Sequence, residues 1–107
     1  MTPAVMAAGV LAAVVGIGSA APTAADSNSA MFVRMLANNG EDVSTPEIQL
    51  AVVDLGYAVC NHLDTTQDPD ATADYMVSLG RSRANANMWL AASVINLCPE
   101  LNHLTGY

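Results

Sequence analysis

The side chains that could do chemistry in this chain are two cysteines and two histidines. Cys60 and Cys98 are its only cysteines, and His62 and His103 follow them closely along the sequence. A pair of thiols forms a disulfide in an oxidising compartment, whereas in a reducing one it stays free or binds a metal. The compartment therefore decides between these chemistries, and the N-terminal segment indicates the compartment.

The first 25 residues carry no charged side chain, and small residues follow the apolar run at positions 4–17. This order is typical of a secretory signal peptide. We expect a signal peptide over residues 1–25, cleaved near Ala25 or, as a second candidate, after Ala20. An uncleaved anchor is the alternative, because about 20 apolar residues can cross a bilayer. The run is mostly alanine, glycine and valine, which favours cleavage.

The remaining residues, 26–107, are enough for one domain, which we expect to be secreted or held in the cell envelope. Its formal charge is −7, with three arginines and no lysine. Such an acidic balance argues against nucleic acid and against anionic lipid as partners. After cleavage the mature chain would retain no stable membrane span.

In an exported domain of this size, Cys60 and Cys98 are expected to form a disulfide. The bond would stabilise the fold by about 4 kcal/mol in the chain-entropy model, which is comparable with what a small core supplies. A metal site is the alternative, with His62 and His103 as further ligands. Residues two apart on a helix point in nearly opposite directions, so Cys60 and His62 cannot share one ion there. We expect no metal.

A second interpretation of His62 is that it binds haem or a similar apolar ligand. This histidine lies at the edge of the apolar face of its helix, and Tyr57 is a further candidate ligand. Small helical domains rarely enclose large pockets, so we expect no cofactor and keep a haem carrier as the alternative function.

Three aspartates, Asp68, Asp70 and Asp74, have part of the spacing of a calcium loop. The glycine that such a loop needs at its sixth position is Ala73 here, and the glutamate at its twelfth is Leu79. We therefore interpret these aspartates as helix caps and surface residues.

Catalysis needs a nucleophile, a base and an orienting group that converge on one point. The chain has only two histidines and no recognisable serine elbow or carboxylate pair. We predict that the protein is not an enzyme.

Apolar residues recur at helical spacing, and no alternating run indicates a strand. Four helices are predicted: residues 27–39, about 18 residues starting at 44–47, residues 68–79, and a segment starting at 81–85 and ending at Cys98. We therefore predict an all-α fold, a small bundle of about four short helices whose second and fourth members the disulfide joins. The tail, residues 100–107, yields no prediction.

The second helix has the clearest signals. Ser44 and Glu47 have the spacing of a capping box, and Pro46 is tolerated in a first turn. Gly56 would let a neighbouring helix approach closely. The apolar face of this helix comprises Ile48, Val52, Leu55, Val59 and Leu63.

In the other helices we expect Phe32, the only phenylalanine, to anchor the first helix. On the third helix, Tyr75, Met76 and Leu79 are expected to point inward. The inward face of the fourth helix is predicted to comprise Met88, Ala91, Ala92, Val94, Ile95 and Cys98.

Two aromatic residues lie outside these predicted faces, Trp89 on the fourth helix and Tyr57 on the second. Either the first helix or the tail covers them, or they are exposed aromatics of the kind that anchor partners. We treat Trp89 and Tyr57 as candidate partner contacts.

The segment Gly56–Cys60, followed by Leu63 and later by Ala91–Pro99, resembles a known family. It is similar to the small secreted mycobacterial proteins grouped as domain-of-unknown-function family 732, over residues 31–100. The resemblance implies an exported, all-helical, disulfide-bonded protein and no established activity. We expect a non-catalytic binding or interaction module whose partner is an unidentified protein or cell-envelope component.

Overall fold

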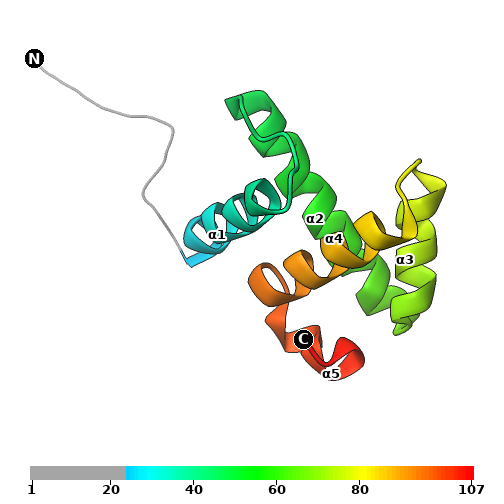
Figure 1. Ribbon diagram of the computed structural model, residues 1–107. Coiled ribbons are helices and arrows are strands. Elements are labelled where there is room, and N and C mark those ends of the chain that lie inside the picture. The colour runs from blue at the N-terminus through cyan, green and yellow to red at the C-terminus, as the bar shows by residue number, and fades with distance from the viewer. Residues whose placement is uncertain (1–23) are drawn as a thin grey trace, which may run out of the picture.

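The computed structural model describes residues 24–107, which form an assembly of helices (Figure 1). Residues 1–23, on which the signal-peptide prediction depends, lie outside the described part. The elements are α1 (Ala24–Asn38), α2 (Pro46–Thr66), α3 (Pro69–Ser78), α4 (Arg83–Asn96), the 3-10 helix η1 (Pro99–Leu101) and α5 (Asn102–Thr105). Residues 24–107 contain no strand, so the all-α prediction is confirmed.

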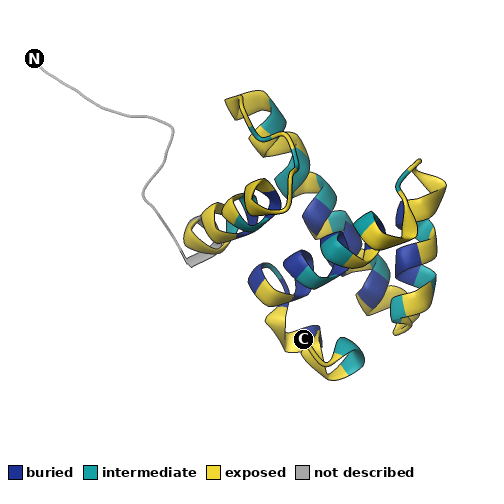
Figure 2. Ribbon diagram, viewed as in Figure 1, coloured by how far each residue is buried: buried dark blue, intermediate teal, exposed yellow. Residues whose placement is uncertain are grey.

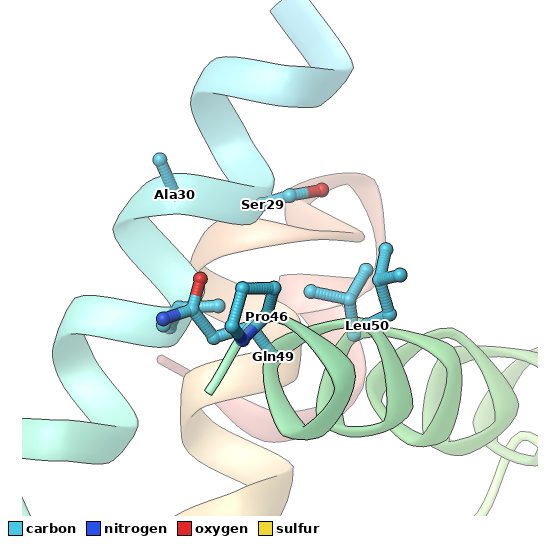
Figure 3. Close-up of a pocket in the computed structure, with 7 residues that line it drawn as sticks. Ser29, Ala30, Pro46, Gln49 and Leu50 are labelled. Atoms are coloured by element: carbon cyan, nitrogen blue, oxygen red, sulfur yellow. The ribbon is translucent and has the colours of Figure 1, made fainter. Parts of the chain in front are cut away.

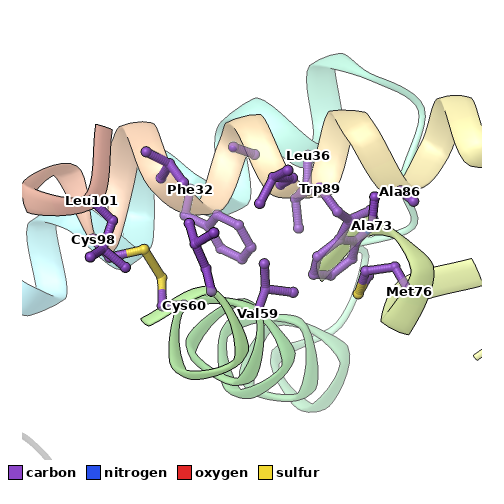
Figure 4. Packing of buried hydrophobic residues seen from close by; sticks show 14 residues of the cluster. Phe32, Leu36, Val59, Cys60, Ala73, Met76, Ala86, Trp89, Cys98 and Leu101 are labelled. Carbon is purple, nitrogen blue, oxygen red and sulfur yellow. A yellow bond between two sulfur atoms is a disulfide. The ribbon is translucent and has the colours of Figure 1, made fainter. Parts of the chain in front are cut away.

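Helix α4 is the centre of the fold, because α1, α2 and α3 all pack against it. It carries no charged side chain after Arg83, which suits a helix with neighbours on three sides. In the core, Phe32 of α1 meets Trp89 edge to face, with ring centroids 5.7 Å apart. The disulfide closes one end of this core and Met76 the other (Figure 4). Phe32 is fully buried and anchors α1, as predicted.

The starts of α2, α3 and α4 agree with the sequence, whereas α1 begins at Ala24, three residues before its predicted start, and the cap of α2 differs. Thr45, not Ser44, is the N-cap, and its hydroxyl accepts a hydrogen bond from the N–H of Ile48 at 3.2 Å. Ser44 precedes the cap, and its N–H donates a hydrogen bond to the carboxylate of Asp42 at 3.0 Å. The capping box predicted from Ser44 is therefore wrong by one residue. Asp68 caps α3 as predicted.

At Gly56, the side chains of Phe32 on α1 and of Leu97, the C-cap of α4, lie directly against α2. A Cβ atom at this position would lie 2.6 Å from Leu97 Cδ1 and 2.6 Å from Phe32 Cζ. Only a hydrogen fits in that space, so the close approach predicted for Gly56 is confirmed. On the neighbouring face of α2, Val59 and Leu63 are fully buried.

The predicted inward face of α4 is right in part, because Ala92, Val94 and Cys98 are buried. The ribbon of α4 carries buried, partly buried and exposed positions (Figure 2). Ile95 is 46% exposed, and Met88 and Ala91 are only partly buried. The helix instead buries a face that carries polar residues: Ala86, Trp89, Leu90, Ser93 and Asn96, with Ala92 and Val94 beside it. Asn96 is accommodated because its amide donates to the carbonyl of Ala92 at 2.9 Å.

The end of α3 and the C-terminal tail also differ from expectation. Leu79 is 52% exposed rather than inward, because α3 ends at Ser78 and Leu79 is its C-cap. The tail, for which the sequence yields no prediction, forms η1 and α5 and buries Leu101 against the core. No helix among residues 24–107 has the length and apolar character needed to span a bilayer.

Candidate functional site

The two cysteines form the predicted disulfide. Cys60 lies on α2 and Cys98 directly follows α4, with Cα atoms 6.1 Å apart. Both are buried, and both sulfur atoms lie against the carbonyl oxygen of Ser93, at 3.8 and 3.6 Å. The same oxygen accepts hydrogen bonds from the N–H groups of Leu97 and Cys98. The disulfide is therefore part of the core, where it has a structural role.

Trp89 is not an exposed partner contact. It is fully buried, with α1 covering one edge through Phe32. The guanidinium of Arg81 lies over the indole at 4.5 Å from the ring centroid and is paired with Glu41 at 3.3 Å. Trp89 as a candidate partner contact is therefore corrected, and the alternative that the first helix covers it holds. Asn85, a polar residue on the same side of α4, is paired with Arg81 and Glu41 instead of facing water.

His62 lies beside a shallow hollow on the other side of α2. Its ring stacks on Tyr75 with centroids 4.8 Å apart, and its Nδ1 lies 3.0 Å from the hydroxyl of Thr72. That hydroxyl donates its one proton to the carbonyl of Asp68 at 3.1 Å. In the arrangement where the Thr72 hydroxyl donates to Asp68, Nδ1 carries a proton and donates to Thr72, and the lone pair of a neutral imidazole lies on Nε2.

The other groups considered from the sequence remain dispersed. His103 lies 3.1 Å from the carbonyl of Glu100 through its Nδ1, far along the chain from His62. Asp68 caps α3, and Asp74 forms an ion pair with Arg83. Within residues 24–107 no group of three or more histidine, cysteine, aspartate or glutamate side chains is arranged to hold a metal ion.

An apolar hollow of the described surface is a groove of about 490 Å³ between α1 and α2 (Figure 3). Pro46 and Leu50 project from α2 into the space beside α1, and Leu50 is 70% exposed. The groove is lined by Ser29, Ala30, Val33, Pro46, Gln49, Leu50 and Val53. No charged side chain is among them. The lining therefore matches an apolar group, with a hydroxyl and an amide as its polar members.

Tyr57 extends the exposed apolar face of α2 about one turn beyond the residues that line this groove. At 100° per residue, Pro46, Leu50, Val53 and Tyr57 fall within an arc of about 60°. Tyr57 is 40% exposed and also borders a second, more polar hollow of about 360 Å³ beside the disulfide. Unlike Trp89, it is placed where a partner could reach it, and its role as a partner contact stays a prediction.

Comparison with known proteins identifies the family. The family described as "Protein of unknown function (DUF732)" matches residues 22–100, from before α1 to within η1. The chain belongs to the DUF732 family. No curated protein matches it. No solved structure matches it either.

The DUF732 match includes the whole groove, yet sequence reasoning did not find it. The signal was present, because Pro46, Leu50, Val53 and Tyr57 are apolar residues spaced 4, 3 and 4 apart on one helix. They lie outside the arc predicted to be buried, so they form a second apolar face on α2. Two apolar faces on one helix indicate either a second packing partner in the fold or a binding surface.

Proposed function

We propose that this DUF732 protein is an exported, non-catalytic binding module and that the groove between α1 and α2 is its binding site. The observation that carries the proposal is Leu50, which is 70% exposed in the middle of an uncharged, apolar hollow. The volume of the groove, about 490 Å³, is in the range of ligand pockets. An exposed leucine in such a setting gains free energy when a ligand covers it.

The absence of chemistry is part of the proposal. In the described chain, the hydrogen bonds of His62 and His103 involve a threonine hydroxyl and a backbone carbonyl, and neither histidine is paired with a carboxylate. The groove lining contains no group that titrates near neutral pH. A site of this kind can hold and orient a ligand, but it offers no nucleophile and base that act together.

Binding can be tested with Nile red, a neutral dye whose emission rises and shifts in apolar surroundings. We expect the oxidised domain to bind the dye. Leu50→Ser should weaken binding about 10- to 100-fold, which corresponds to the free energy of burying one leucine side chain. Leu79→Ser is the matched control, because Leu79 is 52% exposed on α3, away from the groove. Both variants should fold normally, since exposed sites change stability by about 0.5 kcal/mol or less. Equal effects of the two changes would refute the groove as the site.

Export is supported by the uncharged N-terminal segment and by a disulfide that needs an oxidising compartment. Mass spectrometry of the protein recovered outside the cytoplasm tests it. We expect a chain that begins near Asp26 and is lighter by two hydrogens than its reduced form. A product that keeps residues 1–25, or one with free thiols, would contradict export and cleavage.

A haem carrier is the second candidate, and the observation that favours it is the position of His62, which lines a hollow of the described surface and stacks on Tyr75. A lone imidazole cannot build a metal site, but it can serve as axial ligand to an iron that brings four porphyrin nitrogens. Haem titration should then shift the Soret band, His62→Ala should abolish the shift, and the control His103→Ala should retain it. No shift in the unmodified protein removes this candidate.

A further inference from the structure

We propose that the occupant of the groove is an amphipathic helix of a partner protein, with basic residues along the edge that faces α2. This inference rests on the proposed function, since it names the class of ligand that the groove accepts. It uses the length of the apolar wall, the charges along its two edges and the helical construction of both walls.

The first step is the shape of the exposed apolar face of α2. Its four apolar residues run from Pro46 to Tyr57, a length of about 16 Å or roughly three helical turns. Their spacing of 4, 3 and 4 is the spacing at which a helix lying alongside presents its own apolar residues. A ligand that covers both Leu50 and Tyr57 must therefore be elongated.

The second step is the opposite wall, which is built from small and branched residues of α1. Ala30 is exposed and Val33 is partly exposed, and both line the groove. Small side chains such as Ala30 and Ser29 let a third helix approach two others closely. A helix placed here would complete a three-helix arrangement with α1 and the first half of α2.

The third step is charge. Glu47 and Asp54 are exposed and lie about 50° beyond Leu50 around α2, so both flank the groove. They are seven residues apart, which places them about 10 Å apart along the helix axis. The ion pairs of residues 24–107 involve other acids, Glu41 and Asp74.

The α1 edge carries the opposite sign. Arg34 is exposed and lies about 40° beyond Ala30 around α1. A helix with two basic residues seven apart on one edge and an acidic residue on the other matches both edges of the groove. An anionic lipid surface would instead be repelled by the formal charge of −7.

The probe for this proposal is a synthetic helical peptide of roughly four turns. It carries a leucine and alanine stripe, two lysines seven residues apart on one edge and a glutamate on the other. A second peptide has the lysines replaced by glutamates, and a third has the same composition in an order that removes the stripe. Fluorescence anisotropy with the oxidised domain measures binding, and we expect only the first peptide to bind well.

The variants assign the contacts. Glu47→Gln with Asp54→Asn should weaken the lysine peptide about 2- to 30-fold and reduce the salt dependence of its binding, the effect of two exposed ion pairs. Asp70→Asn with Asp74→Asn is the matched control, because it removes the same charge from α3, and it should leave the affinity unchanged. Leu50→Ser should weaken the peptide more than Leu79→Ser does.

The outcomes separate this inference from the function on which it rests. If Nile red binds through Leu50 but no peptide does, the groove is a site for small apolar ligands and the helical partner is refuted. If the glutamate peptide binds as well as the lysine peptide, or the scrambled one binds equally, the proposed charge and helix recognition are refuted. If neither dye nor peptide binds, both proposals fail.

Discussion

Replacing Gly56 by alanine tests the packing at the point where three helices meet. In an ordinary helix position the change would stabilise the protein by about 1 kcal/mol, because alanine has the higher helix propensity. Here the new Cβ would lie 2.6 Å from Leu97 Cδ1 and 2.6 and 2.9 Å from two atoms of the Phe32 ring. Leu97 can move its side chain, but Phe32 is fully buried against Trp89.

Overpacking costs about 1–3 kcal/mol, and three contacts under 3.0 Å place Gly56→Ala in the upper part of that range, at about 2–3 kcal/mol. After the propensity gain of about 1 kcal/mol, the net effect is expected to be a loss of about 1–2 kcal/mol. For a domain of this size that lowers Tm by roughly 5–15 °C. Thermal unfolding followed by circular dichroism, with the disulfide intact, measures the change. Ala51→Gly, at an exposed position of the same helix, supplies the propensity difference alone.

An unchanged or raised Tm for Gly56→Ala would show that Phe32 and Leu97 do not press on α2 as described. Removing the Leu97 contact by Leu97→Ala in the Gly56→Ala protein should have a smaller cost than Leu97→Ala alone. Simple addition of the two costs would also contradict the reasoning, because residues in contact should couple.

Three further predictions concern other parts of the domain. Cys60→Ser with Cys98→Ser should lower the free energy of unfolding by about 4 kcal/mol, because the disulfide joins positions 38 apart. Urea unfolding of the oxidised protein and of the double variant measures this difference. Trp89 is the only tryptophan, so its emission should be blue-shifted and shielded from acrylamide, and Trp89→Ala should cost about 3–5 kcal/mol; red-shifted, readily quenched emission would contradict its burial. The carboxylate of Asp42 accepts hydrogen bonds from the hydroxyl of Ser44, which has the larger effect, and from the N–H of Ser44. Both lower the pKa of Asp42 below its ordinary value of 3.8. This carboxylate therefore stabilises the fold above pH 3.8 and loses that contribution as pH falls through its lowered pKa; NMR titration should show the lower midpoint, and Ser44→Ala should raise it.

The sequence predicts the helices of this fold better than it predicts which faces are buried. The apolar arc of α2 ends in Val59 and Leu63, which are buried, and the close approach at Gly56 follows from the absence of a side chain there. These signals are local and unambiguous, because an amphipathic helix with one glycine in its packed face has few alternatives.

Helix α4 shows why burial was harder to predict. Its inward face includes Ser93 and Asn96, whereas the apolar Ile95 is 46% exposed. Hydropathy assigns polar residues to the surface, but Asn96 satisfies its amide on the backbone of its own helix. A helix surrounded on three sides has no single apolar face, so its orientation depends on neighbours that the sequence does not place.

The groove was missed for a related reason. Its walls come from α1 and α2, whose relative placement is fixed by Phe32 packing at Gly56 and not by any local pattern. The apolar spacing from Pro46 to Tyr57 was visible in the sequence. What the sequence could not supply is which of the two apolar faces of α2 would be covered by the rest of the domain.

The disulfide closes a covalent ring that contains α3, α4 and the last part of α2, and leaves α1 outside it. Side-chain packing, chiefly that of Phe32 and Leu36, keeps α1 on the ring, together with a hydrogen bond from the Asn96 amide to the Met35 sulfur at 3.7 Å. Release of α1 is therefore a partial unfolding that leaves the ring intact, and it would make the amide hydrogens of α1 exchange faster than those of α4. Since α1 supplies one wall of the groove, that release would also remove that part of the binding surface while the covalent ring stays folded.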